Sequence, residues 1–202
     1  MNQIDKIIGE NPALAPCRAA MEQIVSAIVT MHRAGGKLLL CGNGGSAADC
    51  EHISGELLKG FLSKRPIGDE LPMLDGEIRA KLQRGIGAVP LSSLSALSTA
   101  FANDVEPSLI FAQAVYALGQ KGDVVLGLST SGNSKNVVYA AMLAKAIGVK
   151  ILSMTGEKES KLSSLSDVTI RVPSTDTYRV QEYHLPVYHY LCAEVENAFF
   201  GK

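Results

Sequence analysis

A short loop rich in hydroxyl groups is the feature of the sequence with the clearest chemistry. The loop, Ser129-Thr130-Ser131-Gly132-Asn133-Ser134, follows an apolar run and precedes a helical pattern. Its hydroxyls, its flexible glycine and the free N–H groups of a helix start suit a dianionic phosphate, which the helix dipole also favours. The lysine of a nucleotide-binding P-loop is missing. An ordinary capped turn is the alternative, but capping needs only one hydroxyl. The loop therefore predicts a phosphomonoester site.

A second loop has the same strand–turn–helix design. Cys41-Gly42-Asn43-Gly44-Gly45-Ser46 also follows an apolar run and opens a helical pattern. Its glycines permit a ligand to approach the backbone closely. Two such loops at the carboxyl ends of neighbouring parallel strands would frame one crevice. The two loops together therefore predict a single ligand site at that edge of a sheet.

Four further side chains could carry acid–base chemistry. His52 and Glu56 are spaced i,i+4 on the helix after the second loop, while Gln181 and His189 lie eight residues apart on a C-terminal helix. A carboxylate and an imidazole that face one ligand can move protons to and from carbon and oxygen. The same set could instead hold a divalent metal that polarises a carbonyl. From spacing alone, a solvated helix face remains the simpler interpretation of the first pair.

The C-terminal helix leaves two questions open. Glu182 and His184 lie between the two candidate residues of that helix and compete with them for any role. Pro186 lacks the N–H that would bond the carbonyl of residue 182, so we expect a kink that changes how Gln181 and His189 converge.

Alternating apolar runs and helical patterns predict the elements that position these residues. Short buried strands are expected at 37–41, 88–91, 124–128, 150–154 and 168–171, and helices at 12–34, 46–60, 75–84, 95–102, 107–119, 133–148 and 177–199. Strands that alternate with helices indicate a parallel sheet covered on both faces. The polar stretch 62–87, marked by proline and glycine, is interpreted as an insertion.

Composition and charge limit the classes of function. The chain has 202 residues, 47% of them hydrophobic, and a formal net charge of −1. This suits one folded domain and shows no basic excess, so a nucleic-acid partner is not expected. The N-terminus does not resemble a signal peptide, and no apolar run reaches the roughly 18–20 residues that span a bilayer. We therefore expect a cytoplasmic protein without membrane contact. Four scattered cysteines are expected to be free, mostly buried thiols.

These residues together resemble the sugar isomerase (SIS) domain family, and within it the sedoheptulose-7-phosphate isomerases, also called phosphoheptose isomerases. The resemblance covers most of the chain. Four ordered motifs carry it: CGNGGSAAD (41–49) with His52 and Glu56, Asn103-Asp104, KGDVVLGLSTSGNSKNV (121–137), and VPSTDTYRVQE (172–182) with His189.

The resemblance implies a fold and an assembly. It implies an α/β fold in which residues 1–202 form a single SIS domain, with a five-stranded parallel sheet sandwiched by helices and a long N-terminal helix within residues 1–36. It also implies a homotetramer with active sites at subunit interfaces. The insertion at 62–87 is longer than the usual connection at this point, so it could cover the crevice or reshape a subunit contact.

The resemblance also implies an activity: isomerisation of sedoheptulose 7-phosphate to D-glycero-D-manno-heptose 7-phosphate through an enediol, for bacterial surface heptose biosynthesis. Glu56 and His189 match the catalytic acid/base pair. One zinc ion per site is implied at His52, Glu56, Gln181 and His189. The matching substrate-binding positions are Asn43, Gly44, Ser46, Asp104, Ser129, Thr130, Ser131, Ser134 and Gln181.

Two other functions remain open at this point. The chain could be a non-catalytic SIS module that binds a sugar phosphate as a regulator or scaffold, although the retention of His52, Glu56, Gln181 and His189 favours an enzyme. It could also be an isomerase of a different ketose phosphate, which the insertion would permit.

Overall fold

A five-stranded parallel sheet forms the centre of the molecule. The computed structural model describes residues 3–201, and the sheet has the order β2-β1-β3-β4-β5 with every neighbouring pair parallel. The strands are β1 (Leu38–Cys41), β2 (Ala88–Pro90), β3 (Val124–Leu128), β4 (Lys150–Thr155) and β5 (Val168–Arg171). All five strands lie where the apolar runs predict them, with ends that differ by at most one residue.

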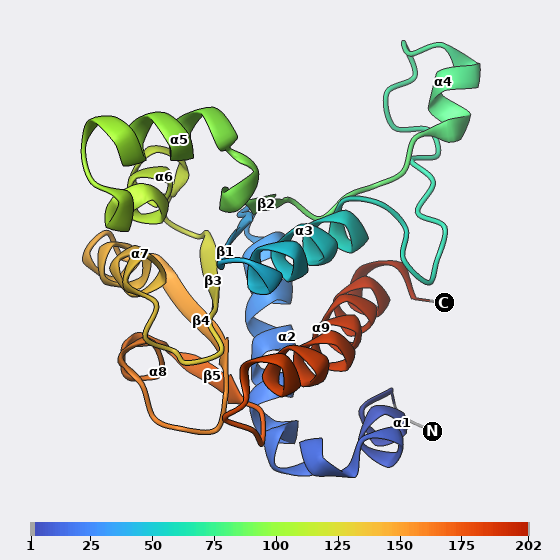
Figure 1. Cartoon of the computed structure of the whole chain (residues 1–202). Helices are drawn as coiled ribbons and strands as arrows, with labels where there is room; N and C mark the ends of the chain where they lie inside the picture. Colours follow the sequence, from blue (N-terminus) through green and yellow to red (C-terminus); the bar gives the residue numbers. More distant parts are fainter. Residues whose placement is uncertain (1–2, 202) are drawn as a thin grey trace.

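Helices cover both faces of this sheet (Figure 1). One layer comprises α1 (Gln3–Glu10), α2 (Arg18–Arg33), α3 (Gly45–Leu58) and α9 (Thr177–Phe200). The other comprises α5 (Ser95–Asp104), α6 (Ile110–Leu118), α7 (Lys135–Ala146) and α8 (Lys161–Leu165). Successive strand residues point to opposite faces, so Leu38 and Leu40 of β1 pack in the first layer and Leu39 packs in the second. The predicted sandwich is confirmed.

The N-terminal helix differs from its prediction. A single helix was expected from Pro12 to Ala34, but residues Pro12–Cys17 form a 3-10 helix and the α-helix α2 begins at Arg18. The reason is Pro16, which has no N–H to donate and restricts the residue before it. The long amphipathic helix is therefore the 16-residue α2, and α1 precedes it as a separate short helix.

The insertion projects away from the sheet and its helices (Figure 1). Its one helix, α4 (Gly76–Lys81), is capped by Asp75, whose side chain accepts from the N–H groups of Glu77 and Ile78. None of the α4 residues is buried. The two ends of the insertion meet at an antiparallel bridge between Pro66 and Gln83. The insertion is thus an arm closed at its base.

The C-terminal helix runs unbroken past its proline. α9 is continuous from Thr177 to Phe200 with Pro186 inside it. The described part of the chain also contains three short 3-10 helices: Pro12–Cys17, Leu91–Ser93 and Pro107–Leu109. All four cysteines are buried and free, as expected. Among residues 3–201, no helix combines the length and apolar character that a bilayer span requires.

Candidate functional site

The two glycine- and hydroxyl-containing loops lie side by side at the carboxyl edge of the sheet. β1 pairs directly with β3, and in the order 2-1-3-4-5 the chain turns in opposite directions after these two strands. Such a switch point leaves a crevice outside the strand ends, where α/β proteins bind their ligands. The predicted neighbourhood of the loops that follow Cys41 and Leu128 is therefore confirmed by the strand register.

A pair of side-chain amides joins the two loops. Asn43 Nδ2 donates to Asn136 Oδ1 at 2.9 Å, and Asn136 Nδ2 donates back to Asn43 Oδ1 at 2.8 Å. Asn136 Oδ1 also accepts the N–H of Val137 at 3.0 Å in the first turn of α7. Asn43 was a predicted site residue, whereas Asn136 had no predicted role although it lies in the motif at 121–137. The pair fixes the Cys41–Ser46 loop against the helix that follows the phosphate loop.

The hydroxyls of the phosphate loop are held together without capping the helix. Ser129 Oγ and Ser134 Oγ are 3.0 Å apart, and Ser134, at the N-cap of α7, makes no side-chain capping hydrogen bond. Ser131 Oγ accepts the N–H of Asn133 at 3.2 Å. The first N–H groups of α7 have no backbone partner within the helix, although that of Val137 is bonded to the side chain of Asn136. Hydroxyls and amides therefore remain available to an anion, which favours binding over simple capping.

The start of α8 packs against the phosphate loop at Gly132. Gly132 has a φ of +64°, and a Cβ atom there would collide with the side chain of Ser160. Ser160 caps α8 through a capping box with Ser163. The N–H of Leu162 donates to the carbonyl of Gly132 at 3.0 Å. Short helix α8, which the sequence analysis did not predict, thus fixes the shape of the phosphate loop.

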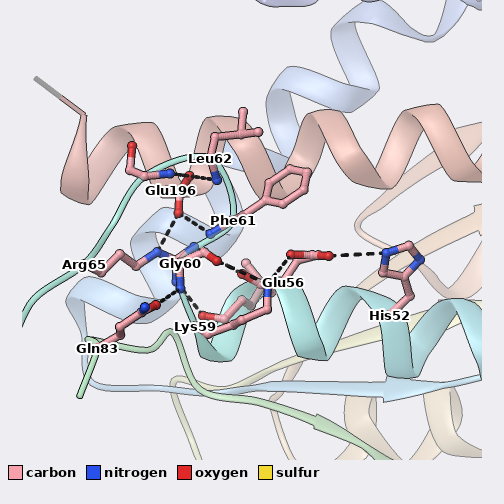
Figure 2. A network of polar contacts seen from close by, with 11 residues as sticks. His52, Glu56, Lys59, Gly60, Phe61, Leu62, Arg65, Gln83 and Glu196 are labelled. Atoms are coloured by element: carbon pink, nitrogen blue, oxygen red, sulfur yellow. Dashed lines mark hydrogen bonds and ion pairs between the residues drawn. The ribbon is translucent and has the colours of Figure 1, made fainter. Parts of the chain in front are cut away.

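The acid–base residues come together between α3 and α9, which pack alongside each other (Figure 1). His52 Nε2 lies 3.4 Å from Glu56 Oε1, and the rings of His52 and His189 are 5.1 Å apart at their centroids. The other carboxylate oxygen of Glu56 receives the ammonium of Lys59 at 2.8 Å, as Figure 2 shows. The structure therefore brings three of the four predicted residues to one place.

Tyr188 is a member of this cluster that the sequence analysis missed. Its hydroxyl lies 2.9 Å from His52 Nδ1, and the side chain is almost fully buried. Burial, reinforced by the nearby charge of Asp49, raises the pKa of Tyr188 far above its usual value, so the phenol stays protonated. The contact holds the His52 ring in one orientation. The only sequence signal was the position of Tyr188 beside His189.

Burial sets the protonation of two groups in the cluster. Burial lowers the pKa of His189, and the charge of His52 lowers it further against an opposing effect of Glu56. His189 is therefore neutral at neutral pH and able to accept a proton. Burial raises the pKa of Asp49 to about 6, against the lowering effects of Tyr188 and His52.

The remaining predicted residues lie at different distances from this cluster. Gln181 packs against Gly45, where a Cβ atom would overlap the Gln181 amide, so Gln181 borders the Cys41–Ser46 loop. It lies two helical turns before His189 on α9. Asp104 ends α5 and is exposed, and its described side-chain hydrogen bond is with Asn103 at 2.8 Å. Ser46 is buried at the start of α3.

The two competitors on α9 do not join the cluster. Glu182 is exposed and pairs with Arg179 at 2.6 Å. His184 is fully buried, and neither of its ring nitrogens meets the geometric criteria for a hydrogen bond with any of residues 3–201. Burial lowers the pKa of His184 to about 4, against an opposing effect of the Thr155 backbone. Within residues 3–201, no three His, Cys, Asp or Glu side chains are arranged as a metal-binding group.

Comparison with known proteins agrees with this geometry. A phosphoheptose isomerase of Burkholderia pseudomallei is 39% identical over 184 residues, which cover 91% of this chain and 84% of the relative. One from Helicobacter pylori is 44% identical over 168 residues, or 83% of this chain and 78% of the relative.

Solved structures match over almost the whole chain. The phosphoheptose isomerase of Francisella tularensis superposes with a TM-score of 0.76 at 29% identity, covering 98% of this chain and all of its own. That of Neisseria gonorrhoeae gives a TM-score of 0.74 at 27% identity, covering 97% of this chain and all of its own. The family model for the SIS domain matches residues 14–156. The chain therefore belongs to the SIS domain family.

Proposed function

We propose that this chain is an aldose–ketose isomerase that converts sedoheptulose 7-phosphate to D-glycero-D-manno-heptose 7-phosphate. The observation that carries the proposal is the meeting of Glu56 with His52 and His189 between α3 and α9, on the helices that border the two loops. Relatives that are 39% and 44% identical over most of the chain are named phosphoheptose isomerases. The reaction would take place in the cytoplasm, and its product would supply heptose for a bacterial surface polysaccharide.

The two ends of the site divide the work. Ser129, Thr130, Ser131 and Ser134 bind the phosphate and fix the position of the sugar chain along the crevice. Either Glu56 or His189 removes the proton from C1 of the ketose, which gives an enediol, and the same proton is returned at C2. The partner moves a proton from the oxygen on C1 to the oxygen on C2. The low pKa of His189 suits it to accept a proton in this exchange.

We also propose that the site holds one zinc ion. Two imidazoles, a carboxylate and an amide oxygen are donor types that zinc accepts. His52 lies beside both Glu56 and His189, although within residues 3–201 the three side chains are not arranged as a metal-binding group. Gln181 would be the fourth ligand. When bound, the metal would stabilise negative charge on the enediol oxygens. Metal analysis by mass spectrometry after dialysis against zinc should give one ion per chain, and His52→Ala should remove it. Equal zinc content in both proteins would contradict the assignment.

We propose further that the chain assembles as a homotetramer with its active sites at subunit interfaces. Large apolar side chains are exposed along and beside the insertion, at Leu58, Leu62, Leu71, Met73 and Ile78. Apolar side chains gathered in this way are typical of subunit contacts. Sedimentation velocity should give the mass of four chains. A single-chain mass across the micromolar range would contradict this proposal.

The decisive experiment is incubation with sedoheptulose 7-phosphate, with and without added zinc, followed by NMR. The appearance of aldoheptose 7-phosphate signals is the expected result. If the sugar phosphate binds but no product forms under either condition, the isomerase proposal is wrong and the chain is a sugar-phosphate-binding regulator or scaffold. The presence of the complete acid–base set and the names of its relatives favour the enzyme.

A further inference from the structure

A buried ion pair joins the insertion to the last helix. Arg65 Nε donates to Glu196 Oε1 at 2.7 Å, and the two side chains are 0% and 2% exposed. Two charges removed from water are costly unless their other donors and acceptors are also satisfied. The groups that bond the remaining donors of Arg65 and acceptors of Glu196 therefore indicate the role of the ion pair.

The guanidinium of Arg65 closes the end of α3. Nη1 donates to the carbonyl of Leu57 at 2.7 Å, and Nη2 donates to the carbonyl of Glu56 at 3.2 Å. The chain leaves α3 abruptly, because Lys59 is extended and no glycine caps the helix. The last carbonyls of a helix lack partners and attract a cation. The N–H of Ile86 also donates to the carbonyl of Leu57, at 2.9 Å, so Arg65 and Ile86 together cap the end of α3 from outside the helix.

The carboxylate of Glu196 organises the turn that follows α3 (Figure 2). It accepts the N–H groups of Phe61 at 2.8 Å, Leu62 at 2.7 Å and Ser63 at 2.9 Å. Burial alone would raise the pKa of Glu196, but these N–H groups and the Arg65 guanidinium hold it below its usual value. Glu196 therefore stays charged and binds the turn to α9.

The turn held by this pair contacts both residues of the proposed acid/base pair. Lys59 reaches the Glu56 carboxylate at 2.8 Å, and the ring of Phe61 packs against His189 with 5.7 Å between centroids. Glu196 lies seven residues after His189, two helical turns along the same side of α9. A displacement of the Arg65–Glu196 pair would therefore move Glu56 and His189 relative to each other.

We propose that the Arg65–Glu196 pair positions Glu56 and His189 for the isomerisation, by bonding the end of α3 to α9 through the turn at residues 59–63. The inference rests on the function proposed above. Neither side chain borders the loops after β1 and β3 in any described contact. The pair should therefore govern the rate of proton transfer and leave phosphate binding unchanged.

Steady-state kinetics on sedoheptulose 7-phosphate separate these effects. Arg65→Lys keeps the charge but replaces three separate nitrogens, each bonded to a different acceptor, by a single ammonium nitrogen. We expect kcat to fall about a hundredfold while KM changes less than about twofold. Glu196→Gln keeps one acceptor oxygen for the turn and should retain more activity than Glu196→Leu. Arg84→Lys is the matched control, because Arg84 pairs with Glu70 on the exposed part of the same insertion. Arg84→Lys should match the wild type.

Histidine NMR tests the inference without turnover. In protein labelled on histidine, Arg65→Lys should displace or broaden the ring signal of His189 and leave that of His184, buried earlier in α9, unchanged. A folded Arg65→Lys variant with wild-type kcat and an unmoved His189 signal would overturn the proposal. If Arg65→Lys and Glu196→Gln both unfold, the pair is purely structural and the proposal is equally wrong. If the wild type forms no aldoheptose phosphate but His189 still moves, the proposed function fails and the positioning stands.

Discussion

Two side chains to which the sequence analysis assigned no role complete the site at the level of single residues. Asn136 bonds Asn43 across the two loops, and Tyr188 holds the ring of His52. The first pair is separated by 93 residues and the second by 136, so no local sequence pattern could predict either contact. The hydroxyls, the glycine and the helix start at Ser129–Ser134, by contrast, predict a phosphate loop from local sequence.

Replacement of Glu56 by Gln tests the proton transfer. Gln keeps the size of the side chain but cannot take a proton, so kcat should fall about a thousandfold or more. The phosphate loop lies on other elements, so binding of sedoheptulose 7-phosphate, measured by calorimetry, should remain within a few-fold of wild type. Turnover close to that of the wild type would remove Glu56 from the reaction.

Replacement of Ser134 by Ala tests the phosphate end. The hydroxyl of Ser134 does not cap α7, so its loss should raise KM about tenfold with little change in the free energy of unfolding. Ser164→Ala is the control, because Ser164 is exposed on α8 and bonds only the carbonyl of Ser160. An equal effect of the two changes on KM would argue against a phosphate contact at Ser134.

At the scale of elements, strands were easier to predict than the ends of helices. Each strand is an apolar run bounded by glycine or polar residues, and these runs gave all five strands. The 3-10 segment before α2 was missed because its apolar spacing continues that of the helix, while Pro16 changes only the hydrogen bonding. Helix α8 was missed because five residues are too few to show a period.

The contact between the phosphate loop and α8 can be tested with two glycines. Gly132 and Gly148 both have positive φ angles, of +64° and +73°, but only at Gly132 would a Cβ atom meet a neighbour, the side chain of Ser160. Each change to Ala should cost about 1–2 kcal/mol of unfolding free energy from the backbone alone. Gly132→Ala should cost more than Gly148→Ala in urea unfolding and should also weaken binding of sedoheptulose 7-phosphate. Equal losses in the two variants would show that α8 does not constrain the loop.

For the molecule as a whole, one buried histidine predicts how stability depends on pH. His184 has a pKa lowered to about 4 by burial, against an ordinary value of 6.5. Between these values the unfolded chain binds a proton that the folded chain does not. The free energy of unfolding should therefore fall as the pH drops from 6.5 towards 4, by roughly 3 kcal/mol from this group.

His184→Phe replaces the titratable ring by an apolar ring, so it removes the protonation site without leaving a cavity. Urea unfolding at pH 8, 6 and 4.5 should show that the variant loses less stability on acidification than the wild type. At pH 8 the variant should be at least as stable, because the two unpartnered ring nitrogens are gone. The same loss of stability in both proteins would mean that other groups cause the acid sensitivity.

The sequence predicted the sandwich and placed the two loops at one edge of the sheet, but it did not predict the side-chain contacts between distant elements. Regular apolar patterns specify which face of each element is buried, and glycine marks where strands end. The Arg65–Glu196 pair joins residues 131 positions apart, and in the sequence each belongs to an ordinary charged segment. Charges of this kind are usually exposed, so only the folded structure distinguishes the buried pair.

The short outer strand of the sheet has a consequence for how copies of this protein can associate. β2 has only three residues and ends at Pro90, which has no N–H to offer a further strand. At the opposite border, Arg171 closes β5 with an exposed charge that is paired with Glu159. Neither border offers a long run of free backbone groups to another molecule. Any assembly of this chain must therefore be built through helix faces and the projecting insertion, and a continuous sheet across subunits is not available to it.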